Sequence, residues 1–391
     1  MRRSDPLPEL PESLDVSYVA DLSRIAAPFG ITHTGVAPAA TLHRARSELH
    51  RRRAAGLHDT MQFTYKNPDR STEPNSAVAG ARAVFVGARP YLDADEHPVA
   101  NADAPADTVD GRGHTVVGRV ARYAQSDHYA PLREGLWAVA ARLRSDGFKA
   151  VAFADDNSMV DREIAYQAGL GWFGKNANLL IAGAGSYFVL GSVVTTAPLP
   201  LASAVVADGC GSCRRCLDGC PTGAIIAPGV VDAARCLAWL LQKPGMFDRR
   251  FRAAVGNRLY GCDDCQEVCP PTVRLGVHHT IPTNGEVGRE AVVDVLDLLD
   301  AADAEVLARW GRWYLADRDP RWLRRNALVI LGNSESASDA RVRATLSRYL
   351  AHDDPVLRAH AVWATRSLAL DHLLPAHDTD AHVIAELTDP L

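Results

Sequence analysis

Cysteine is absent from most of this 391-residue chain, because all eight cysteines fall between residues 210 and 269. Lysine is scarce, with four residues against 38 arginines. The chain uses arginine as its general basic residue, so the abundance of arginine does not by itself indicate a phosphate-bearing partner. The net charge of −5 and the pI near 6.3 exclude a global basic field of the kind that attracts nucleic acid.

Long apolar runs are also missing. No stretch of about 18 apolar residues is present to span a membrane. The first residues, MRRSDPLPELPESLDV, contain two arginines without an apolar segment behind them, which argues against a secretory or twin-arginine leader. We therefore expect a cytoplasmic protein with no membrane partner and a mobile N-terminus over residues 1–16.

What the chain does contain is a pair of cysteine motifs. The first, CGSCRRCLDGCP, has the spacing C-x2-C-x2-C-x3-C-P, and the second, CDDCQEVCP, has the spacing C-x2-C-x3-C-P. Both are typical of the halves of bacterial ferredoxins, in which thiolates hold 4Fe-4S clusters. Because every thiol lies in one 60-residue window, we expect the thiols to act together.

The geometry of two-cluster ferredoxins predicts which thiols share a cluster. A tight C-x2-C-x2-C loop wraps one cluster, and the cysteine before the proline reaches the other. The first cluster then takes four thiolates: Cys210, Cys213, Cys216 and Cys269. The second cluster takes the four that remain, one of which replaces the missing first member of a loop: Cys220, Cys236, Cys262 and Cys265.

Disulfides and zinc are the alternatives for these thiols. Disulfides suit small secreted domains, whereas this chain is large, shows no leader and has no cysteine elsewhere. Zinc also binds paired C-x2-C units, but the third cysteine at the same spacing and the two Cys-Pro endings fit cubane clusters better than a tetrahedral ion. Two 4Fe-4S clusters are therefore the preferred interpretation.

Periodic apolar patterns divide the chain into α+β, cysteine-rich and all-helical parts. Helix and strand patterns alternate over residues 17–200, with a Pro- and Asp-rich loop after Tyr91 that extends to about Gly118. The ferredoxin-like segment covers residues 201–280. Over residues 281–391 the strand patterns disappear, and helices alternate with short turns as in HEAT-like repeats. A simple packing cap is the alternative for that last region.

Several segments resemble the epoxyqueuosine reductase family of cobalamin-dependent, tRNA-modifying iron–sulfur enzymes. They occur in the family's order over most of residues 60–335: MQFTYKNPDRSTEP, ARAVFVGARPY, GRVARYAQSDHY, DDNSMVDREIAYQAGLGWFGKNANLLI, DGCGSCRRCLDGCPTGAI, RCLAWL, GNRLYGCDDCQEVCP and RWLRRNALVILGN. The resemblance implies a cobalamin-binding domain with a nitroreductase-like core, a ferredoxin-like domain with two clusters and a HEAT-like domain that binds tRNA. We also expect an external low-potential electron donor and a monomer.

The family's reaction, reduction of epoxyqueuosine to queuosine at the wobble position of the anticodon loop, sets chemical requirements. Converting an epoxide to an alkene removes one oxygen as water and needs two electrons and protons, and side chains cannot supply the electrons. The resemblance implies that two clusters pass electrons to cobalamin. A carboxylic acid kept neutral in a dry pocket would protonate the departing oxygen.

Asp155 is the residue that the resemblance assigns to this acid. It follows an expected strand and stands 13 residues before Ala168 of the AGLGW motif. Asp156 is adjacent, and a register shift of one residue would exchange the two. Because both lie between a strand and a helix, a loop or N-cap aspartate is the alternative.

The same resemblance implies a set of cofactor-binding positions: Arg70, Val120, Asp155, Lys175, Leu179 and Leu190. Val120 stands where some family members carry a cysteine over the cobalt. For Lys175 a contact with solvent is the alternative. For the two leucines it is an ordinary place in the core.

Two motifs leave their roles open. Gly169, Gly171 and Gly174 of AGLGWFGKN would let a flat corrin ring approach the backbone, and a plain turn between a helix and a strand is the alternative. The family's Asp-Tyr-His order appears here as Asp-His-Tyr, with His128 and Tyr129 exchanged. No role is therefore assigned to either side chain.

Basic residues gather in two segments that are candidates for tRNA binding. The predicted contacts are Lys243, Arg249, Arg252, Arg258, Arg324 and Arg325. Arginine binds phosphates bidentately and stacks on unpaired bases, and an anticodon loop is single-stranded. Against this, WLRRNALVIL has its apolar residues at helical spacing, so part of this region is expected in a core.

Two other functions stay open beside a tRNA epoxyqueuosine reductase. A reductive dehalogenase-like enzyme would use cobalamin and two clusters on a small molecule, but the respiratory dehalogenases usually carry an export leader and lack a HEAT-like tail. A non-catalytic electron-transfer protein would leave the N-terminal 200 residues and the AGLGWFGKN motif without a role. We therefore expect an oxidoreductase that acts on tRNA.

Overall fold

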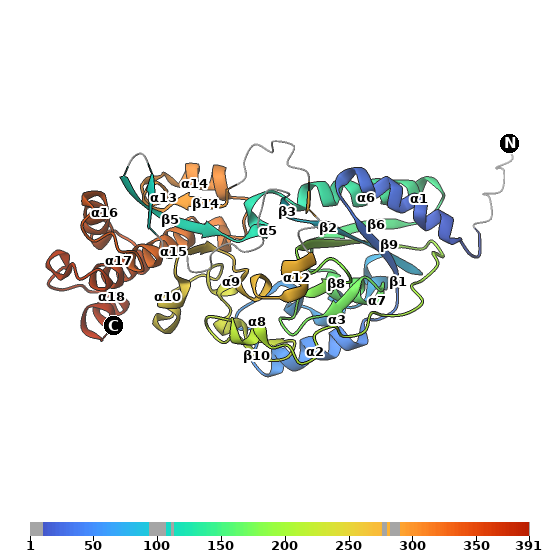
Figure 1. Cartoon of the computed structure of the whole chain (residues 1–391), viewed down its shortest axis with the longest axis horizontal. Coiled ribbons are helices and arrows are strands. Elements are labelled where there is room, and N and C mark those ends of the chain that lie inside the picture. The colour runs from blue at the N-terminus through green and yellow to red at the C-terminus, as the bar shows by residue number, and fades with distance from the viewer. Residues whose placement is uncertain (1–10, 94–106, 111–112, 276–279, 282–289, 391) are drawn as a thin grey trace, which may run out of the picture.

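The computed structural model describes residues 11–93, 107–110, 113–275, 280–281 and 290–390. A sheet-containing half lies at one end, a helical half at the other, and much of the cysteine-bearing segment between them (Figure 1). Residues 1–10 of the expected mobile terminus lie outside the described residues. Helix α1 (Val16–Ala26) starts after Asp15, whose carboxylate accepts a hydrogen bond from the Tyr18 N–H.

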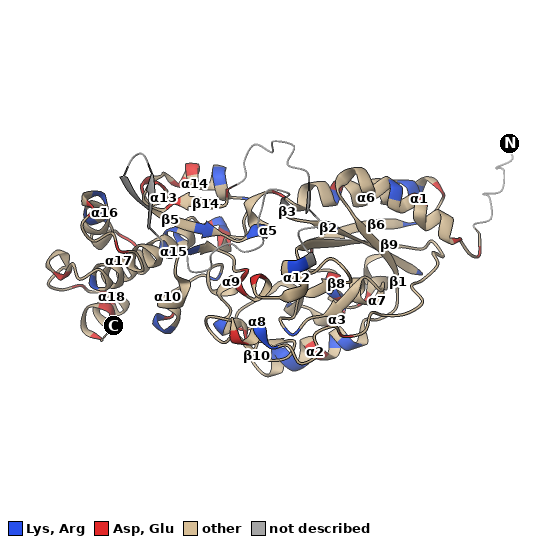
Figure 2. Cartoon of the chain, in the orientation of Figure 1, with Lys and Arg blue, Asp and Glu red and all other residues tan. Residues whose placement is uncertain are grey.

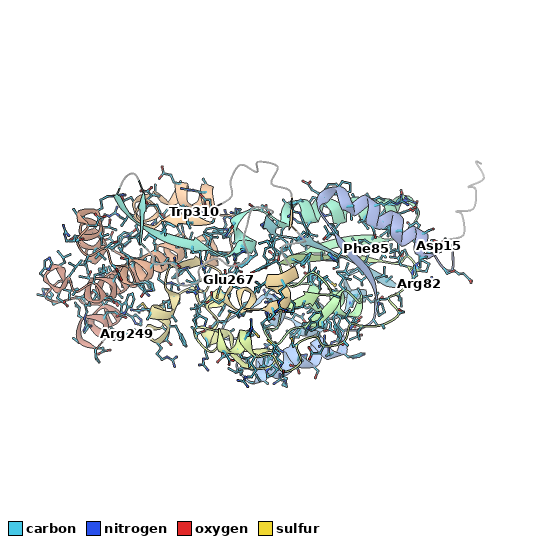
Figure 3. The ribbon with its side chains drawn as sticks, in the orientation of Figure 1. Asp15, Arg82, Phe85, Arg249, Glu267 and Trp310 are labelled. Carbon is cyan, nitrogen blue, oxygen red and sulfur yellow. The ribbon has the colours of Figure 1, made fainter. Side chains whose placement is uncertain are left out.

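The first sheet has four antiparallel strands in the order β1-β2-β9-β6. Their bounds are β1 His33–Pro38, β2 Ala83–Pro90, β9 Phe188–Thr195 and β6 Ala150–Ala154. Every residue of β2 is buried, because successive side chains point to opposite faces and both faces are covered. Phe85 packs into one core layer, whereas Val84 and Val86 pack into the other (Figure 3).

Helices cover both faces of this sheet. Helix α6 (Tyr129–Ser145) packs on β6 and β9, and α1 packs beside it in the same core layer, where Ser23 Oγ lies 2.7 Å from Thr34 Oγ1 of β1. Helix α7 (Asp161–Gln167) packs on β1, β2 and β9 from the opposite face, where α2 (His43–Ala54) also contributes to the core (Figure 1). The result is a three-layer arrangement. A single loop, residues 155–160, connects the edge strand β6 to α7.

The second sheet joins parts of the chain that the sequence assigned to three different domains. Strand β5 (Gly113–Val120) pairs with β4 (Asp107–Asp110), β12 (Arg258–Tyr260) and β14 (Val292–Asp294). Its Val116 and Val120 belong to the same core as the C-terminal helices. The expected loop up to Gly118 is therefore wrong over its second part, and the cores do not follow the expected boundaries at residues 200 and 280.

The cysteine-bearing segment consists of short elements. They are α8 (Arg215–Asp218), β10 (Ile225–Ala227), β11 (Val230–Val231), α9 (Leu237–Leu240), α10 (Arg249–Val255), α11 (Asp264–Glu267) and α12 (Pro270–Leu275). Helix α11 contacts both α8 and α12, which brings the two cysteine motifs side by side. The hairpin of β7 (Gly171–Phe173) and β8 (Leu179–Ile181) connects this segment to the first sheet.

The expected helical tail is present. It comprises α13 (Val295–Asp300), α14 (Asp303–Trp310), α15 (Arg321–Gly332), α16 (Ala340–Leu350), α17 (Pro355–Ser367) and α18 (Ala381–Thr388). Helix α17 packs against α15, α16 and α18. In the described part of the chain no helix has both the length and the apolar character needed to cross a membrane.

Short elements complete the described chain: α3 (Pro68–Ser71), α4 (Pro74–Ala77), α5 (Arg122–Gln125), β3 (Leu92–Asp93) and β13 (Thr280–Ile281). The mixed α/β architecture that the sequence predicts is therefore confirmed.

Candidate functional site

The first cysteine group lines a cavity of about 440 Å³. Its walls include the four thiols predicted for the first cluster: Cys210, Cys213, Cys216 and Cys269. Burial raises the pKa of Cys216 to about 11, and the nearby thiols of Cys269 and Cys210 raise it further. The chain thus brings Cys269 to the same cavity as Cys210, Cys213 and Cys216, from which it is more than 50 residues distant in sequence.

The four thiols of the second cysteine group are half-buried. Burial raises the pKa of Cys265 well above its usual value, and Cys236, Asp263, Cys220 and Cys216 add to the rise. Burial raises the pKa of Cys262 as well, with contributions from Asp264 and Cys265. Cys265 therefore lies within electrostatic range of the other three thiols predicted for the second cluster and of Cys216 from the first.

All eight cysteines are free thiols in this structure, so none of them forms a disulfide. Cys220 Sγ accepts a hydrogen bond of 3.2 Å from the Ala224 N–H and lies 3.7 Å from Thr222 Oγ1. Such donors stabilise a thiolate. Within the described residues, no three His, Cys, Asp or Glu side chains are placed to hold a single metal ion.

The turn of the β7–β8 hairpin, residues 174–178, contacts both cysteine groups. Lys175 Nζ donates hydrogen bonds to the carbonyl oxygens of Gly211 at 2.6 Å and Cys213 at 2.8 Å. Asn176 Nδ2 donates to the carbonyl oxygen of Cys265 at 3.2 Å. Lys175 therefore holds the first cysteine loop, and its contact with a cofactor stays a prediction.

The glycines of this motif allow close packing within the protein. A Cβ atom added to Gly171 would lie 1.9 Å from the carbonyl oxygen of Leu180 on the paired strand. One added to Gly174 would lie 2.2 Å from Leu180 Cδ1. Gly169 has a φ of +74°, and an added Cβ would lie 2.9 Å from the Ala204 carbonyl oxygen. These contacts favour the turn alternative over a surface for a corrin ring.

Asp155 and Asp156 follow β6 directly and differ in their surroundings. Asp156 Oδ1 accepts a hydrogen bond of 2.7 Å from the Ser158 N–H and so stabilises the loop. Asp155 has a positive φ of 54°, and its side chain is exposed at one side of the surrounding protein. Loss of solvation on its protein-facing side raises the pKa of Asp155, Arg133 opposes the rise, and Asp156 adds to it. The two carboxyl groups therefore differ in their surroundings, and a catalytic role for Asp155 stays a prediction.

Other polar groups lie around Asp155. Burial raises the pKa of Tyr129, and the negative charges of Asp155 and Asp161 add to the rise. Asp161 is affected in the same way, first by burial and then by Asp155. Asp161 Oδ1 and Ser192 Oγ are buried, and the Ser192 hydroxyl opposes the rise in the pKa of Asp161. Tyr129, Asp155, Asp161 and Ser192 therefore lie near one another, a grouping that the sequence alone did not reveal.

His128 lies in the protein interior and contacts Arg89. It is buried, and its Nδ1 lies 3.1 Å from Arg89 Nη1. Burial lowers the pKa of His128 to about 3, and the charge of Arg89 contributes. His128 is thus neutral at pH 7 and accepts a hydrogen bond from Arg89.

The remaining predicted cofactor contacts are dispersed. Ser71 Oγ donates to the Asn157 carbonyl oxygen at 2.6 Å, which places the exposed Arg70 of helix α3 next to the loop of Asp155. Val120 and Leu179 are 1% and 5% exposed and pack in two separate cores. Their contact with a cofactor stays a prediction. Leu190 is half-buried against the same core as Leu179.

Three of the predicted tRNA contacts are buried. Arg325 donates hydrogen bonds to the carbonyl oxygens of Leu240, Lys243 and Gly245. Arg252 pairs with Glu386 at 2.8 Å, and Arg258 pairs with Asp264 at 2.8 Å. This burial corrects the expectation for these three arginines, because their guanidinium groups stabilise the fold and do not reach a phosphate backbone.

The other three predicted contacts are closer to the surface, and each has an acidic partner. The pairs are Lys243 with Asp59, Arg249 with Glu386 and Arg324 with Asp303. Arg249 lies next to the C-terminal end of the helical half (Figure 3). Acidic and basic residues are interspersed over the helical half (Figure 2). These three positions stay predictions.

The fold and the two thiol groups define an iron–sulfur oxidoreductase with an α/β domain. Residues 209–272 match the family model of the 4Fe-4S double cluster binding domain. The chain is 35% identical to the epoxyqueuosine reductase of Xanthomonas campestris over 80% of this chain and 85% of that protein. It is 32% identical to that of Burkholderia pseudomallei, over 91% and 95% of the two chains.

Solved structures agree with these relatives. An epoxyqueuosine reductase bound to an epoxyqueuosine-modified tRNA stem loop superposes with a TM-score of 0.81 at 26% identity, over 95% of this chain and 97% of that one. The Bacillus subtilis enzyme, solved with its catalytic aspartate loop swung out of the active site, gives 0.80 at 26% identity, over 95% and 98%. The chain belongs to the epoxyqueuosine reductase family and is an oxidoreductase that reduces epoxyqueuosine in tRNA.

Proposed function

We propose that the chain reduces epoxyqueuosine at the wobble position of the anticodon loop, with cobalamin bound beside Asp155 and with Asp155 as the proton donor. The observation that carries this proposal is the separation of Asp155 from Asp156. Asp156 is held by the Ser158 N–H, whereas Asp155 has a raised pKa and no hydrogen bond among the described residues. The dehalogenase-like and electron-transfer alternatives are not favoured, because relatives matched over most of their length are epoxyqueuosine reductases.

The residues around Asp155 suit an amide-bearing cofactor. Asp161 Oδ1 and Ser192 Oγ are buried polar atoms that lie near each other, and the carboxylate oxygen can accept, and the hydroxyl can donate, a hydrogen bond to a corrin amide. Arg70, in the short helix α3 next to the loop of Asp155, stays a predicted contact. When bound, cobalamin supplies low-potential electrons to the epoxide. Asp155 holds the proton that the departing oxygen needs.

Different observations relate the two thiol groups to this site and to the surface. Tyr260 lies two residues before Cys262, and the charge of Asp155 contributes to the raised pKa of Tyr260 after burial. The cavity of the first group is instead rimmed by the exposed side chains of Arg215 and Arg274. We infer that an external low-potential donor delivers electrons to the first cluster. The second cluster would then pass them to the cofactor bound beside Asp155.

The helical half is the part of the chain that we assign to tRNA. Helix α17 contacts α15, α16 and α18, and we interpret this packing as HEAT-like. Lys243, Arg249 and Arg324 are the basic side chains of the prediction that remain near the surface. Their acidic partners would have to release them before they could contact phosphate.

Asp155→Asn tests the proton donor. The variant should keep iron and cobalamin but lose kcat by at least about 100-fold, because an amide cannot protonate the departing oxygen. The matched control is Asp156→Asn, whose amide oxygen still accepts from the Ser158 N–H and which should keep most of the activity. Conversion is measured from the nucleosides of digested tRNA by mass spectrometry. Equal activity in the two variants would remove Asp155 from the mechanism.

A further inference from the structure

The indole N–H of Trp172 differs from those of four other tryptophans in the described chain. It lines the cavity of the first cysteine group, and its Nε1 is buried without a hydrogen-bond partner among the described residues. Four other tryptophans donate from Nε1 to an oxygen of the protein: Trp239, Trp310, Trp313 and Trp322. A buried N–H without an acceptor is costly, so an acceptor is expected in the cavity itself.

The backbone before the first cysteine holds this indole in place. A Cβ atom added to Gly209 would lie 2.7 Å from Trp172 Cζ2, so the ring rests directly on the backbone next to Cys210. The cation in the same wall, Lys175, is already bound to the carbonyl oxygens of Gly211 and Cys213. The indole ring is therefore fixed against the backbone that leads into the first cysteine loop, in the wall of the same cavity.

The other end of the same hairpin contacts the second group. Asn178 Nδ2 lies 4.0 Å from Cys265 Sγ and donates towards it. The amide is oriented by its neighbour, because the Asn178 N–H donates to Asn176 Oδ1 at 3.2 Å and Asn176 Nδ2 donates to the Cys265 carbonyl oxygen. One hairpin thus presents one N–H donor to each cysteine group.

We propose that Trp172 and Asn178 donate hydrogen bonds to the sulfur atoms of the first and second clusters respectively, and thereby set the two reduction potentials independently. The proposal rests on the assignment of four thiols to each cluster. A hydrogen bond to sulfur stabilises the reduced cluster more than the oxidised one, because the reduced cluster carries more negative charge. Removing the donor therefore makes that cluster harder to reduce.

The test is a potentiometric titration of the reconstituted holoenzyme, followed by EPR, in the absence of tRNA. Trp172→Phe should lower the equilibrium constant for reduction of one cluster about tenfold, or about 59 mV for one electron, and leave the other unchanged. Asn178→Leu should shift only the other cluster. Trp137→Phe is the control, because Trp137 is 56% exposed on α6, away from the cysteine motifs in the sequence.

Unchanged potentials in both variants, or equal shifts of both clusters in each variant, would overturn the proposal. If a variant fails to load its cluster, pulsed EPR of the wild-type holoenzyme labelled with ¹⁵N-tryptophan gives the answer. A hyperfine coupling between a reduced cluster and an indole nitrogen supports the hydrogen bond, and its absence contradicts it. Because no tRNA is present, these outcomes are independent of whether epoxyqueuosine is reduced.

Discussion

Neighbouring side chains of one type acquire different roles through their surroundings. Asp155 and Asp156 are adjacent, yet only the Asp156 carboxylate accepts a hydrogen bond from a backbone N–H. In the same way, Arg325 is fully buried whereas its neighbour Arg324 lies nearer the surface. Residue type and position therefore do not determine chemistry without the hydrogen bonds and burial that the fold provides.

His128 gives a prediction at this scale. Its pKa of about 3 in the folded chain lies below the ordinary 6.5, because burial and Arg89 disfavour the charged form. A lowered histidine pKa contributes stability above pH 6.5 that is lost as the pH falls towards 3. Between pH 6.5 and 5 the free energy of unfolding should fall by about 2 kcal/mol from this residue.

The measurement is chemical denaturation of wild type and His128→Gln over pH 5 to 7.5. Glutamine retains an acceptor for Arg89 but does not titrate, so the difference between the two curves should shrink as the pH falls. Parallel curves would show that His128 does not contribute to the pH dependence.

At the scale of elements, Cys236 shows how a short helix completes a cluster site. It stands at the start of α9, and burial raises the pKa of its thiol. Cys236→Ser should lose the second cluster and roughly half of the iron, because three thiolates hold a cubane poorly. Iron analysis and EPR after anaerobic reconstitution measure the loss. Retention of full iron content would exclude Cys236 as a ligand.

Helix α15 is anchored to the cysteine-bearing segment by Arg325. Burial lowers the pKa of Arg325 to about 9, with a contribution from Arg252, so it stays charged at pH 7. Arg325→Ala leaves three buried carbonyl oxygens without their donor and should cost about 3 kcal/mol in unfolding free energy. Arg341→Ala on the exposed face of α16 is the control and should change it by about 0.5 kcal/mol or less. Equal losses would contradict a structural role for Arg325.

At the scale of the whole molecule, local patterns were predictable and long-range pairings were not. The cysteine spacing predicted both thiol groups, because ferredoxin loops are local motifs. The chain order did not predict that β5 would join β12 and β14, because those partners lie more than 130 residues away in sequence. Nor did it predict that Lys175 would bind a cysteine loop, since the motif's contacts depend on the packing of the hairpin.

The charge pattern was also misleading at this scale. Clustered arginines predicted an RNA surface, yet Arg252 and Arg325 join the cysteine-bearing and helical parts, and Arg258 pairs with Asp264 within the cysteine-bearing part. Glu267, near the middle of the molecule, accepts from Arg122 at 2.7 Å at the contact between α5 and α11 (Figure 3). Buried ion pairs thus connect parts of the chain that are far apart in sequence.

The most direct test is anaerobic turnover of the reconstituted enzyme on tRNA that contains epoxyqueuosine. With both clusters, cobalamin and a low-potential reductant present, epoxyqueuosine should convert to queuosine, and omission of cobalamin should stop the conversion. The nucleosides are quantified by mass spectrometry after digestion of the tRNA. Unchanged epoxyqueuosine in the presence of fully loaded enzyme would contradict the account.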